Sequence, residues 1–168
     1  ITATNRRLFQ PPPIIKTGVP ASQQDALTWR YTTDKPADDW FDPKCEDSGW
    51  KSGPGGFGTE GTPGTSVRTR WATPDIWIRR TVKLDSVPAT PALLIHHDED
   101  AETYINGKLV TQVKGYTTDY VALPLSASAA KALRAGDNTI AIHCHQTGGG
   151  QYIDVGLAEE IESPSRAR

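Results

Sequence analysis

The sequence predicts an antiparallel β-sandwich of jelly-roll type with one short helix. Three observations lead to this fold class. Several segments alternate apolar and polar residues, which is the pattern of a half-buried strand. Turn-forming residues separate these segments. The stretch 126–135 is the one convincing helical segment, because it is rich in alanine and is followed by Gly136.

The clearest element is a hairpin that begins near residue 95. An acidic turn, Asp98-Glu99-Asp100, leads into a strand in which alternate residues from Ala101 to Ile105 share one face. Asn106-Gly107 is a strong two-residue turn signal, because a type I′ turn needs positive φ at both central positions. We therefore expect positive φ at Gly107 and a returning strand that starts at Leu109-Val110.

The chain divides into three predicted parts. Residues 1–24 contain three consecutive prolines and little periodicity, which predicts a linker or a strap along the surface. Residues 25–160 form the sandwich, and residues 161–168 form a polar tail. Within the sandwich, the Gly- and Pro-rich segment 53–64 is predicted to be a loop, and loops of this length are often functional. The remaining predicted strands are 27–31, 75–84, 91–95, 116–125, 138–145 and 152–157.

The apolar phases of three strands predict the core. Nine residues are expected to be buried together: Ala101, Thr103, Ile105, Ile140, Ile142, Cys144, Ile153, Val155 and Leu157. Arg80 shares its phase with Ile78 and Val82, so its charged head should meet a carboxylate or reach the sheet edge.

Composition narrows the functional classes. The chain has 168 residues, which is the size of one domain with a core of its own. A formal charge of −2 and a pI near 6.1 argue against a nucleic-acid binder. The sequence has no apolar run of transmembrane length and no signal peptide. It also lacks Met, so we expect a mature or excised piece of a larger protein. The spacing of Cys45 and Cys144 does not demand a disulfide, and two free thiols are expected.

Three segments carry a resemblance to a known family. They are Ile76 to Thr81, Asp100 to Lys108 and Gly136 to Ile142, and Asp47 to Trp50 adds a fourth. In this order and spacing they resemble the sugar-binding jelly-roll domain of glycoside hydrolase family 2, within the galactose-binding-like fold. The resemblance covers roughly residues 27–158. It implies a non-catalytic accessory module of a secreted or periplasmic carbohydrate-active enzyme, whose catalytic carboxylates lie in a separate barrel domain.

Two groups of residues are candidates for metal binding. His143 and His145 alternate on a strand, point to one face and could share Zn²⁺, but further ligands would be needed. We favour the alternative interpretation, in which the two histidines form hydrogen bonds with polar loops and hold no metal. Asp98 and Asp100 offer oxygen ligands for a structural Ca²⁺, which needs six to eight of them. We favour a solvated acidic turn with one carboxylate paired to Arg79 or Arg80, and no cofactor. Cys144 should face away from both histidines, so no thiolate–imidazole pair is expected.

A sugar site needs an aromatic platform and fixed polar groups. We expect one wall of the site at the end of strand 138–145, with Trp71 or Tyr152 as the platform. The residues predicted to bind ligand are Arg70, Trp71, His143, His145, Gln146, Gln151 and Tyr152.

These observations leave three hypotheses for function. The first is a non-catalytic module that binds carbohydrate, with the catalytic module of the same parent chain as its other partner. The second is a structural domain that docks on that catalytic module and completes its active site. The third is a small metal-dependent hydrolase that uses His143 and His145. None of the three involves nucleic acid or a membrane.

Overall fold

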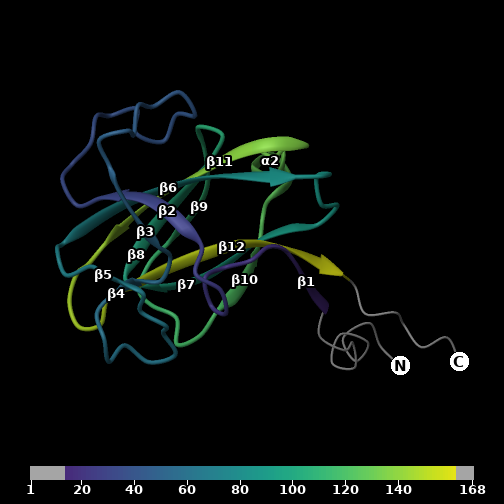
Figure 1. Cartoon of the computed structure of the whole chain (residues 1–168). Helices are drawn as coiled ribbons and strands as arrows, with labels where there is room; N and C mark the ends of the chain where they lie inside the picture. The colour runs from purple at the N-terminus through teal and green to yellow at the C-terminus, as the bar shows by residue number, and fades with distance from the viewer. Residues whose placement is uncertain (1–13, 162–168) are drawn as a thin grey trace, which may run out of the picture.

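The computed structural model describes residues 14–161, which form a sandwich of two six-stranded sheets (Figure 1). The first sheet contains β1 (Ile14–Val19), β4 (Phe57–Gly58), β5 (Thr69–Arg70), β7 (Pro91–Asp98), β10 (Val121–Pro124) and β12 (Tyr152–Ile161). Its order is β10-β7-β12-β4-β5, and β1 also pairs with β12. The second sheet contains β2 (Thr28–Thr32), β3 (Lys51–Pro54), β6 (Asp75–Leu84), β8 (Asp100–Ile105), β9 (Lys108–Val113) and β11 (Gly136–His145). Its order is β3-β2-β6-β11-β8-β9. The predicted β-sandwich is therefore confirmed.

The core lies between the two sheets and contains all nine residues predicted to be buried. None of them is more than 7% exposed, and Ile142, Cys144 and Ile153 are fully buried. Burial alternates along β8 and, at the end of β11, over residues 142–145, so the other phase of these stretches lies on the outer face of the second sheet. This division matters for function, because the outward phase carries His143 and His145.

Part of that outer face is covered by the segment 33–50. Trp40 from this segment packs with Trp77, whose side chain points outward from β6. The buried guanidinium of Arg79 holds the segment in place: Nε donates to Asp47 Oδ2 at 3.0 Å, and Nη1 donates to the carbonyl oxygens of Trp40 and Asp42. Segment 33–50 thus covers the part of the outer face around Trp77 and Ala141.

The Asn106-Gly107 hairpin is confirmed. Asn106 has φ of 51° and Gly107 has φ of 81°, as a type I′ turn requires. The Asn106 side chain also anchors the turn, since Nδ2 donates to the Ala132 carbonyl at 2.8 Å and Oδ1 accepts from Thr139 N at 2.9 Å.

Gly107→Val is expected to lower the free energy of unfolding by about 1–3 kcal/mol, because a β-branched residue is strained at positive φ. Chemical denaturation of wild type and variant measures the difference. Gly107→Asn is the control, because asparagine tolerates this conformation and should cost much less. Equal stability of all three proteins would contradict the turn geometry.

Several predicted boundaries differ from the structure: the predicted strand 116–125 is limited to β10, and three other segments differ more. Residues 14–19, within the predicted linker or strap, form β1 along β12, and five of these six residues are exposed. An edge strand of this kind shows no alternation in sequence. The predicted loop 53–64 contains the end of β3 and all of β4. The predicted helix 126–135 is shortened to α2 (Ala127–Ala130), because Ala132 and Leu133 turn into the core. Residues 11–13 and most of the predicted polar tail lie outside the described range.

Both cysteines are free thiols, with Cys144 buried and Cys45 half-buried. No helix within residues 14–161 is long and apolar enough to cross a membrane.

Candidate functional site

The register of the second sheet places polar residues in two rows across its outer face. In one row, Asp75 of β6 pairs with His145 of β11, which pairs in turn with Asp100 of β8. In the next row, Trp77 pairs with His143, His143 with Glu102, and Glu102 with Gln112 of β9. Alternate residues of a strand point to one face, so two rows spaced by two residues bring their side chains together.

Asp75 connects the two histidines. Its Oδ1 atom lies 2.7 Å from His143 Nε2 and 2.8 Å from His145 Nδ1. Partial burial opposes ionisation of this carboxyl, but the hydrogen bonds from His145 and His143 hold the pKa of Asp75 below its ordinary value. The ring of His143 also stacks on Trp77 with 4.6 Å between centroids and 5° between planes. Both imidazoles therefore have fixed orientations, and His145 remains exposed.

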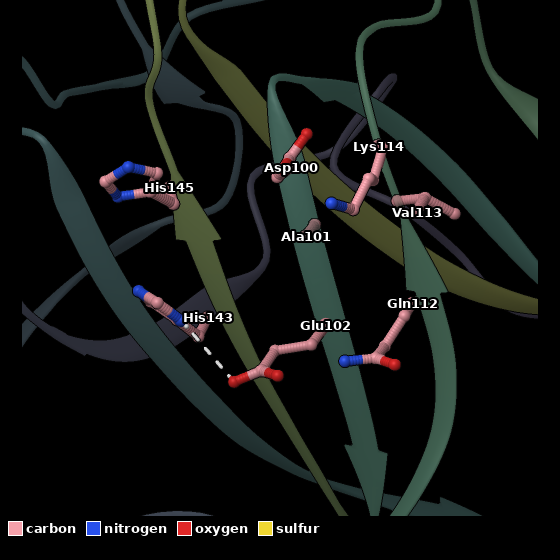
Figure 2. A pocket seen from close by; sticks show the side chains of 8 residues that line it. All are labelled: Asp100, Ala101, Glu102, Gln112, Val113, Lys114, His143 and His145. Atoms are coloured by element: carbon pink, nitrogen blue, oxygen red, sulfur yellow. Dashed lines mark ion pairs between the residues drawn. The ribbon is translucent and has the colours of Figure 1, made fainter.

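A groove of about 470 Å³ opens beside this pair, and Figure 2 shows the side chains around it. Three adjacent elements supply them: β11, β8 and the end of β9 with the residue after it. The groove is lined by Asp100, Ala101, Glu102, Gln112, Val113, Lys114, His143 and His145. His143 Nδ1 lies 3.5 Å from Glu102 Oε1, the ion pair drawn in Figure 2. The groove therefore combines acceptors, donors and both signs of charge.

The acidic turn separates this groove from a second hollow. Asp100 faces the groove, where its Oδ1 accepts from Gly115 N at 2.9 Å. Asp98 and Glu99 line the second hollow, which we call the loop pocket. The expected pairing of this turn with Arg79 or Arg80 is wrong. Arg79 binds Asp47, and Arg80 forms no ion pair with any described residue. The Arg80 head lies inside the sandwich, 6.0 Å from the Trp29 ring.

The other predicted site residues do not line the groove. Gln146 donates Nε2 to the Gly150 carbonyl at 2.6 Å, and Gln151 is buried with Nε2 donating to the Thr73 carbonyl at 2.6 Å. Both amides thus serve loop structure. Arg70 is exposed on β5 and does not line the groove.

Trp71 is 1% exposed and Tyr152 is fully buried, so neither ring offers a face to a ligand. Trp71 packs in the core, and its Nε1 donates to the Asp75 carbonyl at 3.1 Å. Tyr152 faces outward from the first sheet but is covered, and its hydroxyl lies 3.1 Å from that of Tyr120. The expected stacking platform is therefore not supplied by either residue.

Three polar groove residues and one exposed aromatic residue carry no signal of their role in the sequence. Glu102, Gln112 and Lys114 join the histidines through strand register, which sequence periodicity does not reveal. Tyr116 lines the loop pocket and is 68% exposed, although the sequence placed it in a strand.

The site offers no support for metal or thiol chemistry. Within residues 14–161, no group of three or more His, Cys, Asp or Glu side chains is arranged to hold a metal ion. The hypothesis of a hydrolase with a metal on His143 and His145 therefore has no geometric basis. Cys144 lies on the opposite face from both histidines, and burial raises the pKa of its thiol well above the ordinary range.

The fold is related to that of glycoside hydrolase family 2 structures. A glycosyl hydrolase family 2 member from Bacteroides cellulosilyticus superposes with a TM-score of 0.56 and 16% identity, over 83% of this chain and 20% of that one. A β-glucuronidase from Bacteroides uniformis gives a TM-score of 0.55 at 21% sequence identity, over 87% of this chain and 18% of that one. A β-glucuronidase from an uncultured Clostridium gives a TM-score of 0.54 at 16% sequence identity, and the match covers 90% of this chain and 30% of that one.

This chain therefore spans less than a third of each of these proteins. At such low identity the likeness shows the fold alone. No model of a protein family matches the sequence, and no curated protein matches it.

Proposed function

We propose that this chain is a non-catalytic module that binds carbohydrate within a carbohydrate-active enzyme. The observation that carries the proposal is the groove on the open outer face of the second sheet, in which fixed donors and acceptors gather over three strands. Sugar hydroxyls both donate and accept hydrogen bonds, so a mixed lining of this kind suits them. The fold supports the proposal, because it occurs as about a fifth of the length of a family 2 glycosyl hydrolase.

Each groove residue has a distinct role in this proposal. The carboxylates of Asp100 and Glu102 accept hydrogen bonds from hydroxyl groups, and Lys114 and Gln112 donate them. His145 is half exposed, with 49% of its side chain accessible, and Asp75 fixes its ring. A ring held by a protein partner loses little conformational entropy when a ligand binds, which favours affinity.

Calorimetric titration against a panel of plant, algal and bacterial glycans tests the proposal. The wild-type chain is expected to bind one class, and His145→Ala and Glu102→Gln should each weaken that binding by roughly tenfold, the cost of one lost hydrogen bond to a charged group. Lys83→Ala is the matched control. It lies on β6, the strand beside β11, and pairs with Asp137 at the opposite end from His145. Unchanged affinity in both groove variants would place the site elsewhere.

A second function is favoured by exposed apolar side chains on the paired strands β1 and β12. Ile14 and Ile161 pair across β1 and β12 and are 52% and 39% exposed, and Ile15 is 38% exposed. Apolar side chains exposed along neighbouring strands suit a contact with another domain. In this proposal the chain docks on a catalytic module of its parent protein. Failure of the wild type to bind any glycan would favour this function over the first.

A further inference from the structure

The loop pocket is separate from the groove, on the other side of the acidic turn. It has a volume of about 240 Å³. Four chain segments form it: the loop after β4, the acidic turn, the segment after β9 and the loop between β11 and β12. Its lining residues are Thr62, Pro63, Asp98, Glu99, Tyr116, Thr117, Thr118, Gly148, Gly149 and Gly150.

Hydrogen bonds fix the walls of this pocket. Thr117 N donates to the His97 carbonyl at 2.9 Å, and His97 N lies 3.2 Å from Thr117 Oγ1. On the other side, Gln151 N donates to Thr62 Oγ1 at 3.1 Å. His97 Nδ1 lies 2.7 Å from the Glu99 carbonyl oxygen and so supports the acidic turn. The pocket is therefore pre-organised, which lowers the entropic cost of binding.

Asp98 is the unusual residue of the pocket. It is only 8% exposed, yet within residues 14–161 its carboxylate accepts no hydrogen bond and forms no ion pair. The carboxylate oxygens themselves are not sealed inside the protein, because the buried, unpartnered side-chain oxygens within residues 14–161 do not include those of Asp98. Burial and the neighbouring Glu99 carboxylate raise the pKa of Asp98 above its ordinary value. This carboxylate lines an open hollow, so a ligand can supply its missing donors.

Gly150 lies close against this carboxylate. A Cβ atom at position 150 would collide with Asp98 Oδ2 and would lie 3.0 Å from Thr62 Oγ1. The lack of a side chain at this position therefore allows the backbone of residue 150 to lie close against the Asp98 carboxylate in the wall of the pocket.

Tyr116 supplies the aromatic surface that the groove lacks. It is 68% exposed, and its backbone forms an isolated bridge with Asp98. An exposed aromatic ring next to an unpaired carboxylate is the combination that a sugar ring requires, with apolar C–H groups on its face and hydroxyl groups around its edge. The apolar face of the Tyr116 ring is exposed to solvent, and a bound sugar would cover this face.

The charge of the pocket defines the class of sugar. Asp98 and Glu99 both line it, and no Lys, Arg or His does. The groove differs, because Lys114, His143 and His145 line it. An acidic sugar in the loop pocket would meet two carboxylates at short range and no basic side chain in the lining, which is unfavourable.

We propose that the loop pocket is a second sugar subsite that takes an uncharged sugar residue, with Asp98 accepting hydrogen bonds from neighbouring hydroxyls and Tyr116 covering the ring face. This inference rests on the proposed carbohydrate-binding function. The two hollows share the acidic turn as a wall, so a glycan that crosses the turn would occupy both.

Calorimetric titration with three sets of oligosaccharides tests the subsite. The sets are neutral gluco-, galacto- and manno-oligosaccharides, the corresponding uronic-acid oligosaccharides, and chitosan oligomers as carriers of amino groups. Wild type is expected to bind a neutral set at least tenfold more tightly than its acidic counterpart. Tyr116→Ala and Asp98→Asn should each weaken neutral binding by about tenfold. Tyr116→Phe is the control, because it keeps the ring and should keep the affinity.

The outcomes separate this inference from the proposed function. If His145→Ala and Glu102→Gln weaken binding but Tyr116→Ala and Asp98→Asn do not, the subsite is disproved and the module remains a sugar binder. Preference for the acidic set, or binding of chitosan oligomers alone, also overturns the subsite. Binding of no glycan overturns both proposals. Thermal unfolding confirms that each variant is folded. Tyr116 is on the surface, so its variant decides the outcome if Asp98→Asn does not fold.

Discussion

Trp71→Ala is expected to lower the free energy of unfolding by about 3–5 kcal/mol, the usual cost of removing a buried tryptophan. The side chain is 1% exposed within the main core cluster, so its loss leaves a large cavity. The variant also loses the hydrogen bond from Trp71 Nε1 to the Asp75 carbonyl. Urea denaturation, followed by circular dichroism, measures the change in stability.

Trp71→Phe provides the comparison, because it keeps an aromatic ring and loses only part of the volume and the N–H donor. It should cost clearly less than Trp71→Ala. A stable Trp71→Ala protein with weakened glycan binding would contradict the buried position, and would restore Trp71 as a stacking platform. The two roles of this residue are therefore separable by experiment.

Trp71 shows that a sequence pattern does not distinguish a core residue from a ligand-binding one. An aromatic residue beside a Gly-rich segment has the same pattern whether it packs in the core or faces a ligand. Periodicity places a residue on one phase of a strand, but it does not tell whether that face is covered. Tyr152 illustrates the same point, because it belongs to the outward phase of β12 and is still fully buried.

The cover over Tyr152 comes from segments far away in the chain. Asp154, next in the same phase, accepts a hydrogen bond from Ser22 N at 2.8 Å and one from Tyr120 Oη at 2.5 Å. Contacts over 132 and 34 residues of sequence are tertiary features, which no local pattern encodes. The prediction of a linker or strap over residues 1–24 left no such role for Ser22.

The histidine pair shows what the sequence does encode. The spacing of His143 and His145 predicts a shared face, and the structure confirms that both project away from the core. Their partners depend on which strands lie beside β11. Asp75 and Glu102 meet the pair only because β6 and β8 flank that strand in one register. The alternation of a strand therefore predicts half of a cross-strand site, and the topology supplies the other half.

The last prediction tests that register. Ile142 is fully buried at the centre of the second sheet, paired with Ile78 on one side and Thr103 on the other. Ile142→Ala is expected to lower the free energy of unfolding by about 2–5 kcal/mol, and the control Ile142→Val by about 0.5–1.5 kcal/mol. Denaturant titration of the three proteins gives both values. The comparison uses a common slope m of the unfolding free energy against denaturant concentration.

A one-residue slip of β11 would reverse both faces of the strand, because successive side chains point in opposite directions. Ile142 would then lie on the surface and His143 would lie in the core. In that case Ile142→Ala would cost little, and His143→Ala would relieve a buried polar group without affecting a surface groove. A large loss of stability for Ile142→Ala, together with normal stability of His145→Ala, therefore verifies the register on which the groove depends.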